Sequence, residues 1–181
     1  TSLEGTLISL FIKHKSYFVN LRNLALPEFY GHTIAAVLAV ASALNINLKV
    51  AANAISKDFM LPPGRGRIFA GIKNTAIIDS SYNASRETMT GSLRMLKQIS
   101  GNKTKIAVLG DMRELGSQAE TEHQKVAETA VKFADKIILV GPLMKEYALP
   151  TIKKSKLPVE WFATAGEAAN YLLEGSHPSN N

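Results

Sequence analysis

Cysteine is absent from this sequence of 181 residues. Its absence excludes disulfide frameworks, thiolate zinc sites and a cysteine nucleophile within the chain. It is also compatible with a reducing compartment, and we expect a cytoplasmic protein. The four histidines are far apart in the sequence and lack the spacing of metal ligands, so the sequence predicts no metal site.

Long apolar runs are absent as well. No stretch approaches the ~20 apolar residues that a membrane-spanning helix needs. Residues 1–20 lack the charged head, apolar middle and small-residue cleavage site of a signal peptide. We therefore expect no membrane insertion. Because the chain begins at Thr1 rather than at a methionine, we also expect a fragment of a longer protein.

Aromatic side chains do not accompany the basic residues. The formal net charge of +6 fits nucleic acid, a membrane surface or a small anionic substrate. The densest basic cluster, Lys153, Lys154 and Lys156, lies between two proline-marked segments and is most simply interpreted as a solvated loop. Without aromatic rings to stack on bases, the sequence predicts no nucleic acid partner.

A phosphate-binding loop of the form GxxxxGK[ST] is also missing. Residues 64–67, Gly-Arg-Gly-Arg, are rich in glycine but lack the lysine and the hydroxyl of that loop. Two interpretations stay open. Arg65 can grip a phosphate, because a guanidinium pairs bidentately with oxyanions, or the segment is a flexible hinge with solvated arginines. No nucleophile and base have a convincing spacing, so we predict no catalytic residue in this chain.

Hydrophobic residues make up 46% of the chain, which is enough for a sizeable core. Their periodicity predicts two strands and then two helices, at residues 6–12, 17–21, 33–44 and 48–58. Residues 61–66, LPPGRG, break any helix because they hold two prolines and two glycines. We therefore place a domain boundary there, between residues 1–60 and 61–181.

Beyond this boundary the pattern changes to strands that alternate with helices of 10–15 residues. This alternation predicts an α/β fold with βαβ units and a mostly parallel sheet. The predicted strands are residues 67–70, 75–79, 106–109, 137–140 and 159–162, and the predicted helices are 86–99, 117–133 and 165–173. Capping boxes are expected to open the last two helices, formed by Ser117 with Glu120 and by Thr164 with Glu167.

Ligands of open parallel sheets bind at the carboxyl ends of the strands. Three loops are expected at such ends, at residues 79–85, 110–116 and 141–142. The first reads Asp-Ser-Ser-Tyr-Asn-Ala-Ser, and its many donors and acceptors favour a binding loop. Asp79 and Asn83 are also good caps for the helix that follows, and this alternative stays open.

Five segments, in this order, resemble the Mur ligase family, which builds the peptide of the bacterial cell-wall precursor. They are LEGTLISLFI, GHTIAAVLAVASALNI, LPPGRGRIFAG, IIDSSYNASRETM and AVLGDMRELG, with His123 downstream. The resemblance covers almost the whole chain. The pairing of DSSYNAS with GDMRELG is most similar to the branch of the family that adds D-alanyl-D-alanine to UDP-MurNAc-tripeptide.

The resemblance implies the end of a central ATPase domain at residues 1–60. The family's Rossmann-like, acceptor-binding C-terminal domain would follow at residues 61–181, truncated before its native end. In the family reaction, ATP converts a substrate carboxylate to an acyl phosphate, and the amine of D-Ala-D-Ala attacks it, with Mg²⁺ neutralising the phosphates. The implied ligands are ATP, Mg²⁺, UDP-MurNAc-tripeptide and D-Ala-D-Ala, with ATP and Mg²⁺ bound mainly upstream of this fragment.

The resemblance also implies site residues. Arg65 falls on the linker arginine that contacts the ATP phosphates. The other nucleotide-binding residues implied are His32, Thr33 and Ser80. The substrate-binding residues implied are Asp79, Ser81, Tyr82, Asn83 and Ala84.

Some positions depart from the family's motifs. Thr33 and Ala36 stand where the family has two asparagines near the adenine, Ser80 stands where it has an acid for the ribose, and Arg86 replaces a proline. Thr33 and Ser80 keep one hydrogen bond each, whereas Ala36 cannot. Two alternatives therefore stay open, a superfamily ligase for another amine and a non-catalytic relative that binds a nucleotide or a partner protein.

Overall fold

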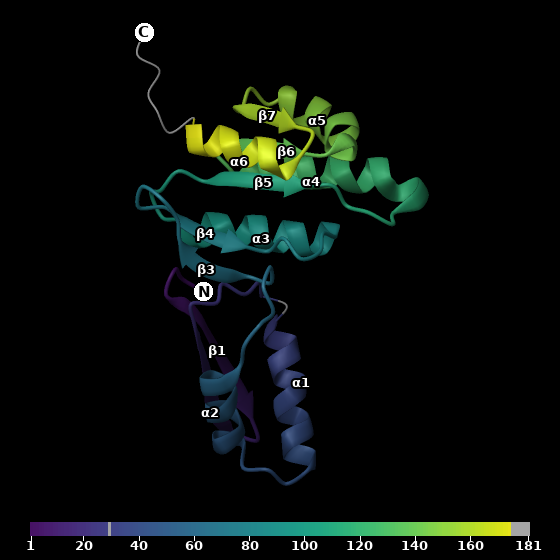
Figure 1. Ribbon diagram of the computed structural model, residues 1–181. Coiled ribbons are helices and arrows are strands. Elements are labelled where there is room, and N and C mark those ends of the chain that lie inside the picture. The colour runs from purple at the N-terminus through teal and green to yellow at the C-terminus, as the bar shows by residue number, and fades with distance from the viewer. Residues whose placement is uncertain (29, 175–181) are drawn as a thin grey trace. The chain divides into compact units, whose positions relative to one another are not determined.

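The computed structural model describes residues 1–28 and 30–174 (Figure 1). The chain divides into two compact units, Thr1–Asn83 and Ala84–Asn181. The boundary predicted between residues 60 and 61 concerns the domains of a longer enzyme and stays a prediction. No helix of the described residues has the length and apolar character needed to cross a membrane.

The first unit begins with an antiparallel hairpin and two helices. β1 (Gly5–Ile12) pairs with β2 (Lys15–Arg22), and α1 (Tyr30–Ala43) and α2 (Leu48–Asp58) follow. These elements confirm the two strands and two helices predicted for this region. The buried core of the unit consists of Val19, Leu21, Leu24, Leu26, Ile34, Leu38, Ala41, Leu48 and Ala52.

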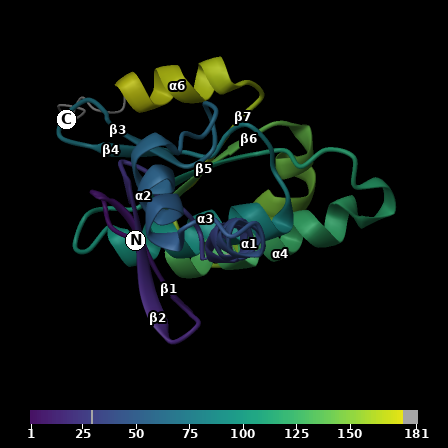
Figure 2. The same ribbon diagram turned by 90° about the horizontal axis from the view of Figure 1, so that it is seen from below.

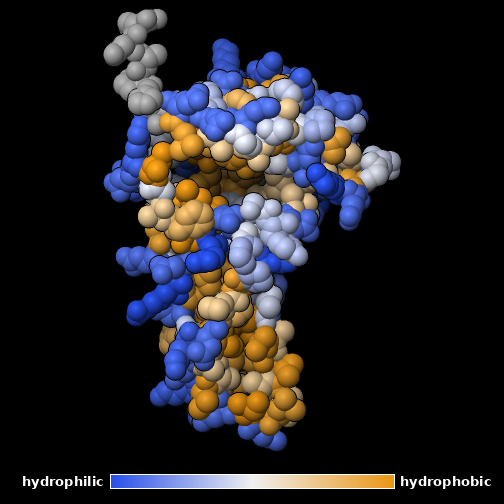
Figure 3. Space-filling model, in the orientation of Figure 1, coloured by the Kyte–Doolittle hydropathy of each residue, from blue (hydrophilic) through white to orange (hydrophobic). Residues whose placement is uncertain are grey.

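The outer face of α1 is apolar as well. Val37 and Val40 are exposed, as is Leu44 directly after the helix, although Ile34 and Leu38 on the inner face are buried. Hydrophobic side chains accordingly gather over α1 at the lower right of the molecular surface in Figure 3. A helix that is hydrophobic on all sides is typical of a helix that is covered on all sides.

A second hairpin completes the first unit. β3 (Arg67–Ala70) and β4 (Ala76–Asp79) pair antiparallel, with Arg67 opposite Asp79. Lys73 and Asn74 in the turn have positive φ angles of 51° and 60°. Such a pair of left-handed residues gives a turn the twist that an antiparallel hairpin needs. The two predicted strands are confirmed, but they form a separate two-stranded sheet.

The second unit is built around a parallel sheet of three strands. β5 (Ile106–Gly110), β6 (Lys136–Val140) and β7 (Val159–Phe162) lie in the order β5-β6-β7. The connections are helical, because α4 (Ala119–Phe133) joins β5 to β6 and α5 (Leu149–Lys153) precedes β7. The predicted α/β class with parallel βαβ units is therefore confirmed.

Helices cover both faces of this sheet (Figure 2). α3 (Arg86–Ile99) and α4 lie on one face, and α6 (Ala165–Glu174) lies on the other. The buried core of the unit consists of Leu93, Ala107, Leu109, Met112, Val126, Ala127, Ala130, Ala134, Ile137, Leu139, Met144, Ala148 and Ile152. The short helical segment Met144–Ala148 and α5 were not predicted from the sequence.

The capping box predicted for Ser117 and Glu120 is wrong. Gly116–Gln118 form a short 3₁₀ helix, and α4 begins only at Ala119, without a side-chain cap. Ser117 is thus inside a helical turn, where its hydroxyl cannot take the half-helical cap position. At the start of α6 the cap is present, because the backbone N–H of Glu167 donates to Thr164 Oγ1 at 3.2 Å. The Glu167 carboxylate accepts instead from the N–H of Ala163.

Candidate functional site

The two segments that the sequence singled out for binding lie side by side in the first unit. The backbone N–H of Gly66 donates to the carbonyl of Asp79 at 2.6 Å, and the N–H of Tyr82 donates to the carbonyl of Gly64 at 3.1 Å. On the other side, the carbonyl of Gly66 accepts from the N–H of Ala25 at 3.0 Å. The glycine segment is therefore hydrogen-bonded on two sides, which disfavours its interpretation as a free hinge.

Close approach of these strands requires the two glycines. Gly64 and Gly66 have φ angles of 79° and 84°, in the region that favours glycine. A Cβ atom on Gly64 would lie 2.8 Å from the nitrogen of Tyr82. A Cβ atom on Gly66 would lie 2.6 Å from the carbonyl oxygen of Ala25. The backbone of Arg65, between them, is consequently held in one place.

Arg65 stacks on an aromatic ring. Its guanidinium carbon lies 4.2 Å from the centroid of the Tyr82 ring, and both side chains are exposed. Among the described residues, no carboxylate lies within ion-pair distance of Arg65. Because the five N–H donors of a guanidinium point outward in its plane, stacking leaves them available. The arrangement is suited to an anion, and a phosphate group fits it.

Asp79 shapes the turn after β4. Its Oδ1 accepts from the backbone N–H of Ser81 at 3.1 Å and from the Ser81 hydroxyl at 2.6 Å. Asp79 and Ser80 are half-buried, whereas Ser81, Tyr82 and Asn83 are exposed. Ser81, Tyr82 and Asn83 are thus exposed on a turn that the two hydrogen bonds to Asp79 stabilise.

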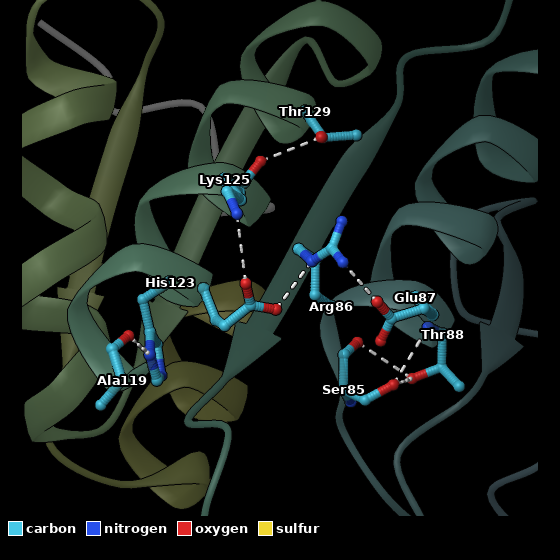
Figure 4. A network of polar contacts seen from close by, with 9 residues as sticks. Ser85, Arg86, Glu87, Thr88, Ala119, His123, Lys125 and Thr129 are labelled. Atoms are coloured by element: carbon cyan, nitrogen blue, oxygen red, sulfur yellow. Dashed lines mark hydrogen bonds and ion pairs between the residues drawn. The ribbon is translucent and has the colours of Figure 1, made fainter. Parts of the chain in front are cut away.

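The N-cap of α3 is Ser85 rather than Asp79 or Asn83. The Ser85 hydroxyl accepts from the backbone N–H of Thr88 at 3.3 Å. The N–H of Ser85 donates to Thr88 Oγ1 at 3.0 Å, so the capping box is complete (Figure 4). Ala84, the last predicted site residue, is half-buried and packs against the core of the second unit. Asp79 and Asn83 are therefore not the N-cap of α3, because Ser85 occupies that position.

His32 and Thr33 lie in the first turn of α1, and both are exposed. Ala36 lies one turn further on and is exposed as well. No hydrogen bond or ring contact joins these residues to Arg65 within residues 1–28 and 30–174. The structure therefore brings Arg65 together with the loop of Tyr82, but not with the helix residues predicted for the nucleotide.

The loop after β5 is held by internal contacts. Asp111 Oδ1 accepts from the N–H of Met144 at 2.8 Å, and Oδ2 accepts from the N–H of Leu143 at 3.2 Å. A Cβ atom on Gly141 would lie 2.6 Å from this carboxylate. Asp111 thereby ties the end of β5 to the segment after β6. Its role in this contact was not predicted, since nothing in the local sequence identifies the partner.

His123 fixes the same loop from α4. Its side chain is fully buried, and its Nε2 accepts from the backbone N–H of Met112 at 3.1 Å. Its Nδ1 lies 2.6 Å from the carbonyl of Ala119, one turn back on the same helix (Figure 4). A ring that accepts at Nε2 and donates at Nδ1 is a neutral imidazole with its proton on Nδ1. Both polar ends of the ring are satisfied, which assigns His123 a structural role.

A network of charges joins α3 to α4 (Figure 4). Arg86 Nε donates to Glu122 Oε2 at 2.7 Å, and a terminal nitrogen of Arg86 donates to Glu87 at 2.6 Å. Lys125 lies 3.5 Å from the other oxygen of Glu122. Burial raises the pKa of Glu122, but the hydrogen bond and the charge of Arg86 outweigh it and hold this pKa below its ordinary value. The network was missed because it joins residues that are 36 positions apart.

Within the described residues, no group of three or more His, Asp or Glu side chains could hold a metal ion.

Comparison with known proteins identifies the family. A sequence model described as the glutamate ligase domain of Mur ligases matches residues 64–180. The UDP-N-acetylmuramoyl-tripeptide–D-alanyl-D-alanine ligase of Rickettsia prowazekii is 28% identical over 89% of this chain and 36% of the relative. The ligase of the same name from Escherichia coli is 33% identical over 61% of this chain and 25% of its own length.

Solved structures show the same fold. A crystal structure of MurF from Acinetobacter baumannii gives a TM-score of 0.79 at 25% identity, over 96% of this chain and 36% of that one. MurF from Thermotoga maritima in complex with ADP gives a TM-score of 0.77 at 22% identity, over 96% and 38%. The matched regions therefore cover only about a quarter to two fifths of these relatives' lengths. Because the glutamate ligase domain matches well over half of the sequence, the chain belongs to the Mur ligase family, as its motifs predicted.

Proposed function

We propose that this chain is part of an ATP-dependent peptide ligase that adds D-Ala-D-Ala to UDP-MurNAc-tripeptide. The observation that carries the proposal is the pairing of residues 64–66 with residues 79–82. This pairing puts an arginine with free donors beside the loop whose motif resembles the D-Ala-D-Ala-adding branch. The names of the curated relatives and the ADP-bound relative support the same assignment.

In this proposal Arg65 serves the phosphate side of the reaction. The substrate carboxylate attacks the terminal phosphorus of ATP, ADP leaves, and the dipeptide amine then displaces phosphate from the acyl carbon. Negative charge on the transferred phosphate must be stabilised in both steps, and the in-plane donors of Arg65 are suited to this. The ATP loop and the ligands of Mg²⁺ would belong to the remaining part of the enzyme.

The loop beside Arg65 serves the acceptor. D-Ala-D-Ala is a zwitterion, so its site needs acceptors near the ammonium group and donors near the carboxylate. Asn83 offers both, and Ser81 adds a hydroxyl group on the same exposed segment.

We also propose that the enzyme works in the cytoplasm, as its relatives' nucleotide-linked substrate suggests.

The apolar outer face of α1 supports the proposed domain division. Val37, Val40 and Leu44 are exposed in the first unit, as would be expected if residues 1–60 were the end of a larger central domain. Residues 61–181 would then be the acceptor-binding domain, most of which matches the family model.

One observation favours a second candidate, a non-catalytic relative. Ala36 stands where the family helix has an asparagine near the adenine, and it is exposed on α1 without a polar group. Weakened adenine binding would be compatible with a protein that has kept the fold and lost turnover. The third possibility is a ligase of the same family that uses another amine as its acceptor. The assay described next distinguishes all three.

The test is an assay of the longer ligase that contains this chain. ADP release should require ATP, Mg²⁺, UDP-MurNAc-tripeptide and D-Ala-D-Ala together, and mass spectrometry should identify the pentapeptide product. L-Ala-L-Ala, D-glutamate and diaminopimelate serve as control acceptors. Turnover with a control amine in place of D-Ala-D-Ala would contradict the acceptor, and nucleotide binding without any ligation would favour the non-catalytic relative.

Arg65 provides the residue-level test. Arg65→Ala should slow the ATP-dependent step by about 10²-fold, because it removes a charge-assisted contact to the transition state. Arg65→Lys should restore only part of the rate, since the point charge of an ammonium group does not reproduce the bidentate hydrogen bonds of a guanidinium. Arg22→Ala, at an exposed arginine of β2, is the matched control for loss of charge. Unchanged kinetics in Arg65→Ala would reduce Arg65 to a structural residue.

A further inference from the structure

Tyr82 is 64% exposed, but the guanidinium carbon of Arg65 lies 4.2 Å from the centroid of its ring. We propose that Tyr82 is a positioning residue for Arg65, which holds the guanidinium so that its donor edge faces a phosphate of the nucleotide. This inference rests on the phosphate contact of Arg65 in the proposed function. It moves Tyr82 from the dipeptide side, where the sequence motif placed it, to the nucleotide side.

The backbones of both residues are fixed in contact. Tyr82 donates its N–H to Gly64, and the missing Cβ of Gly64 leaves the space that the Tyr82 backbone and Cβ occupy. Gly66 is hydrogen-bonded to Asp79 and to Ala25 on its two sides. The two side chains therefore start from neighbouring anchored positions, so their stacking follows from the backbone pairing.

A ring orients an arginine without neutralising it. A carboxylate partner would use the donors of Arg65 and cancel its charge, whereas a stacked ring uses only the face of the guanidinium. Asp79, the nearest acid along the loop, instead accepts two hydrogen bonds from Ser81 through its Oδ1. In the part of the chain that the structure describes, no acid pairs with Arg65. The positive charge of this exposed side chain is thus not neutralised by an ion pair among the described residues.

Preorganisation is the expected benefit. An exposed arginine samples many rotamers. When a ligand orders this side chain, the loss of conformational entropy offsets part of the binding free energy. Stacking on Tyr82 restricts these rotamers before the nucleotide arrives. The contribution of Tyr82 should therefore appear in nucleotide binding, should need the ring but not its hydroxyl, and should disappear when Arg65 is absent.

The experiment is a double-mutant cycle on the longer ligase that contains this chain. Calorimetry gives the Kd of a non-hydrolysable ATP analogue, and kinetics give the KM of D-Ala-D-Ala. Tyr82→Leu should weaken analogue binding about two- to fivefold, the range of an exposed cation–π contact. Tyr82→Phe should bind like the wild type, because it keeps the ring face. In the Arg65→Ala background, Tyr82→Leu should have no further effect.

Three results would overturn the proposal. One is an unchanged Kd in Tyr82→Leu with a raised KM for D-Ala-D-Ala, which would show that Tyr82 contacts the dipeptide. Another is an equal loss from Tyr82→Leu with and without Arg65, which would show that the ring acts directly. The third is a wild-type enzyme that does not bind the ATP analogue, which would exclude a role of Tyr82 in nucleotide binding. An enzyme that binds the analogue but does not use D-Ala-D-Ala would contradict the proposed function alone, because the cycle is still measured.

Discussion

The guanidinium of Arg86 bridges α3 and α4 through its 2.7 Å contact with Glu122 (Figure 4). Arg86 is the first residue of α3 and follows directly after the cap Ser85. The family's motif has a proline here, and both residues are compatible with the first position of a helix. Arginine, unlike proline, can also form an ion pair with the neighbouring helix. In this chain the beginning of α3 is therefore attached to α4 by an ion pair that a proline could not form.

This ion pair should make stability depend on pH. Burial raises the pKa of Glu122, but the hydrogen bond and charge of Arg86 hold it below the ordinary value. A carboxylate with a lowered pKa stabilises the fold above its unfolded pKa of about 4.3 and loses this effect as pH falls through the folded pKa. Glu122→Gln should therefore melt below the wild type at pH 7, and the difference should shrink below pH about 4.

Glu128→Gln is the control for that measurement. Glu128 is an exposed carboxylate on the same helix, and exposed charges contribute little to stability. Its melting temperature should follow the wild type at every pH. If the two glutamine variants have the same pH profile, the Arg86 contact does not stabilise the protein.

His123 should be required for the stability of the second unit. His123→Leu removes the acceptor of the Met112 N–H and leaves a buried donor unsatisfied, at a cost of about 1–3 kcal/mol. Urea denaturation gives the free energy of unfolding, and hydrogen exchange at the Met112 amide gives the local effect. His32→Leu, at an exposed histidine of α1, should change neither. Full protection of the Met112 amide in His123→Leu would contradict this role.

Gly64→Ala should destabilise more than an ordinary substitution of a left-handed glycine. Its Cβ would lie 2.8 Å from the Tyr82 nitrogen, in addition to the strain of a φ of 79°. Gly101→Ala is the matched control, because Gly101 has a φ of 53° but no atom within 4 Å of the added Cβ. The control should lose about 1 kcal/mol from backbone strain alone. Equal losses in the two variants would show that the Gly64–Tyr82 approach is not tight.

Local patterns in the sequence predicted much of the fold. The ranges 48–58 and 86–99 were predicted to the residue, because the helical periodicity is local to each segment. Ser117 misled the prediction, since a capping motif is local and the 3₁₀ turn at Gly116–Gln118 displaced it. Residues 144–153 were missed, although Met144 and Ile152 are fully buried. Tertiary packing decides their structure, and local periodicity does not reveal it.

The candidate site was predictable as parts but not as a whole. Motifs named Arg65 and Tyr82 separately, and placed them on opposite sides of the proposed reaction. Their contact depends on the register of β3 and β4, in which Arg67 faces Asp79 and the pairing continues outward to Gly64 and Tyr82. A register is fixed by turn geometry and burial together, so a motif alone cannot give it.

Asn83 decides whether the loop after β4 binds the acceptor. In the longer ligase, Asn83→Ala should raise the KM for D-Ala-D-Ala about tenfold or more and leave the KM for ATP nearly unchanged. The expected free energy is that of a hydrogen bond to a charged group, roughly 1.5–3 kcal/mol. This contrast follows from placing the amide beside the zwitterionic dipeptide.

Ser85→Ala is the matched control for Asn83. Ser85 is the N-cap of α3, so its loss should cost about 1 kcal/mol of stability and affect every substrate to the same degree. Because Ser85 is the N-cap of α3, Asn83→Ala should leave this cap intact. A fall in melting temperature with an unchanged KM for the dipeptide would instead assign Asn83 to the fold, and the acceptor would have to bind elsewhere.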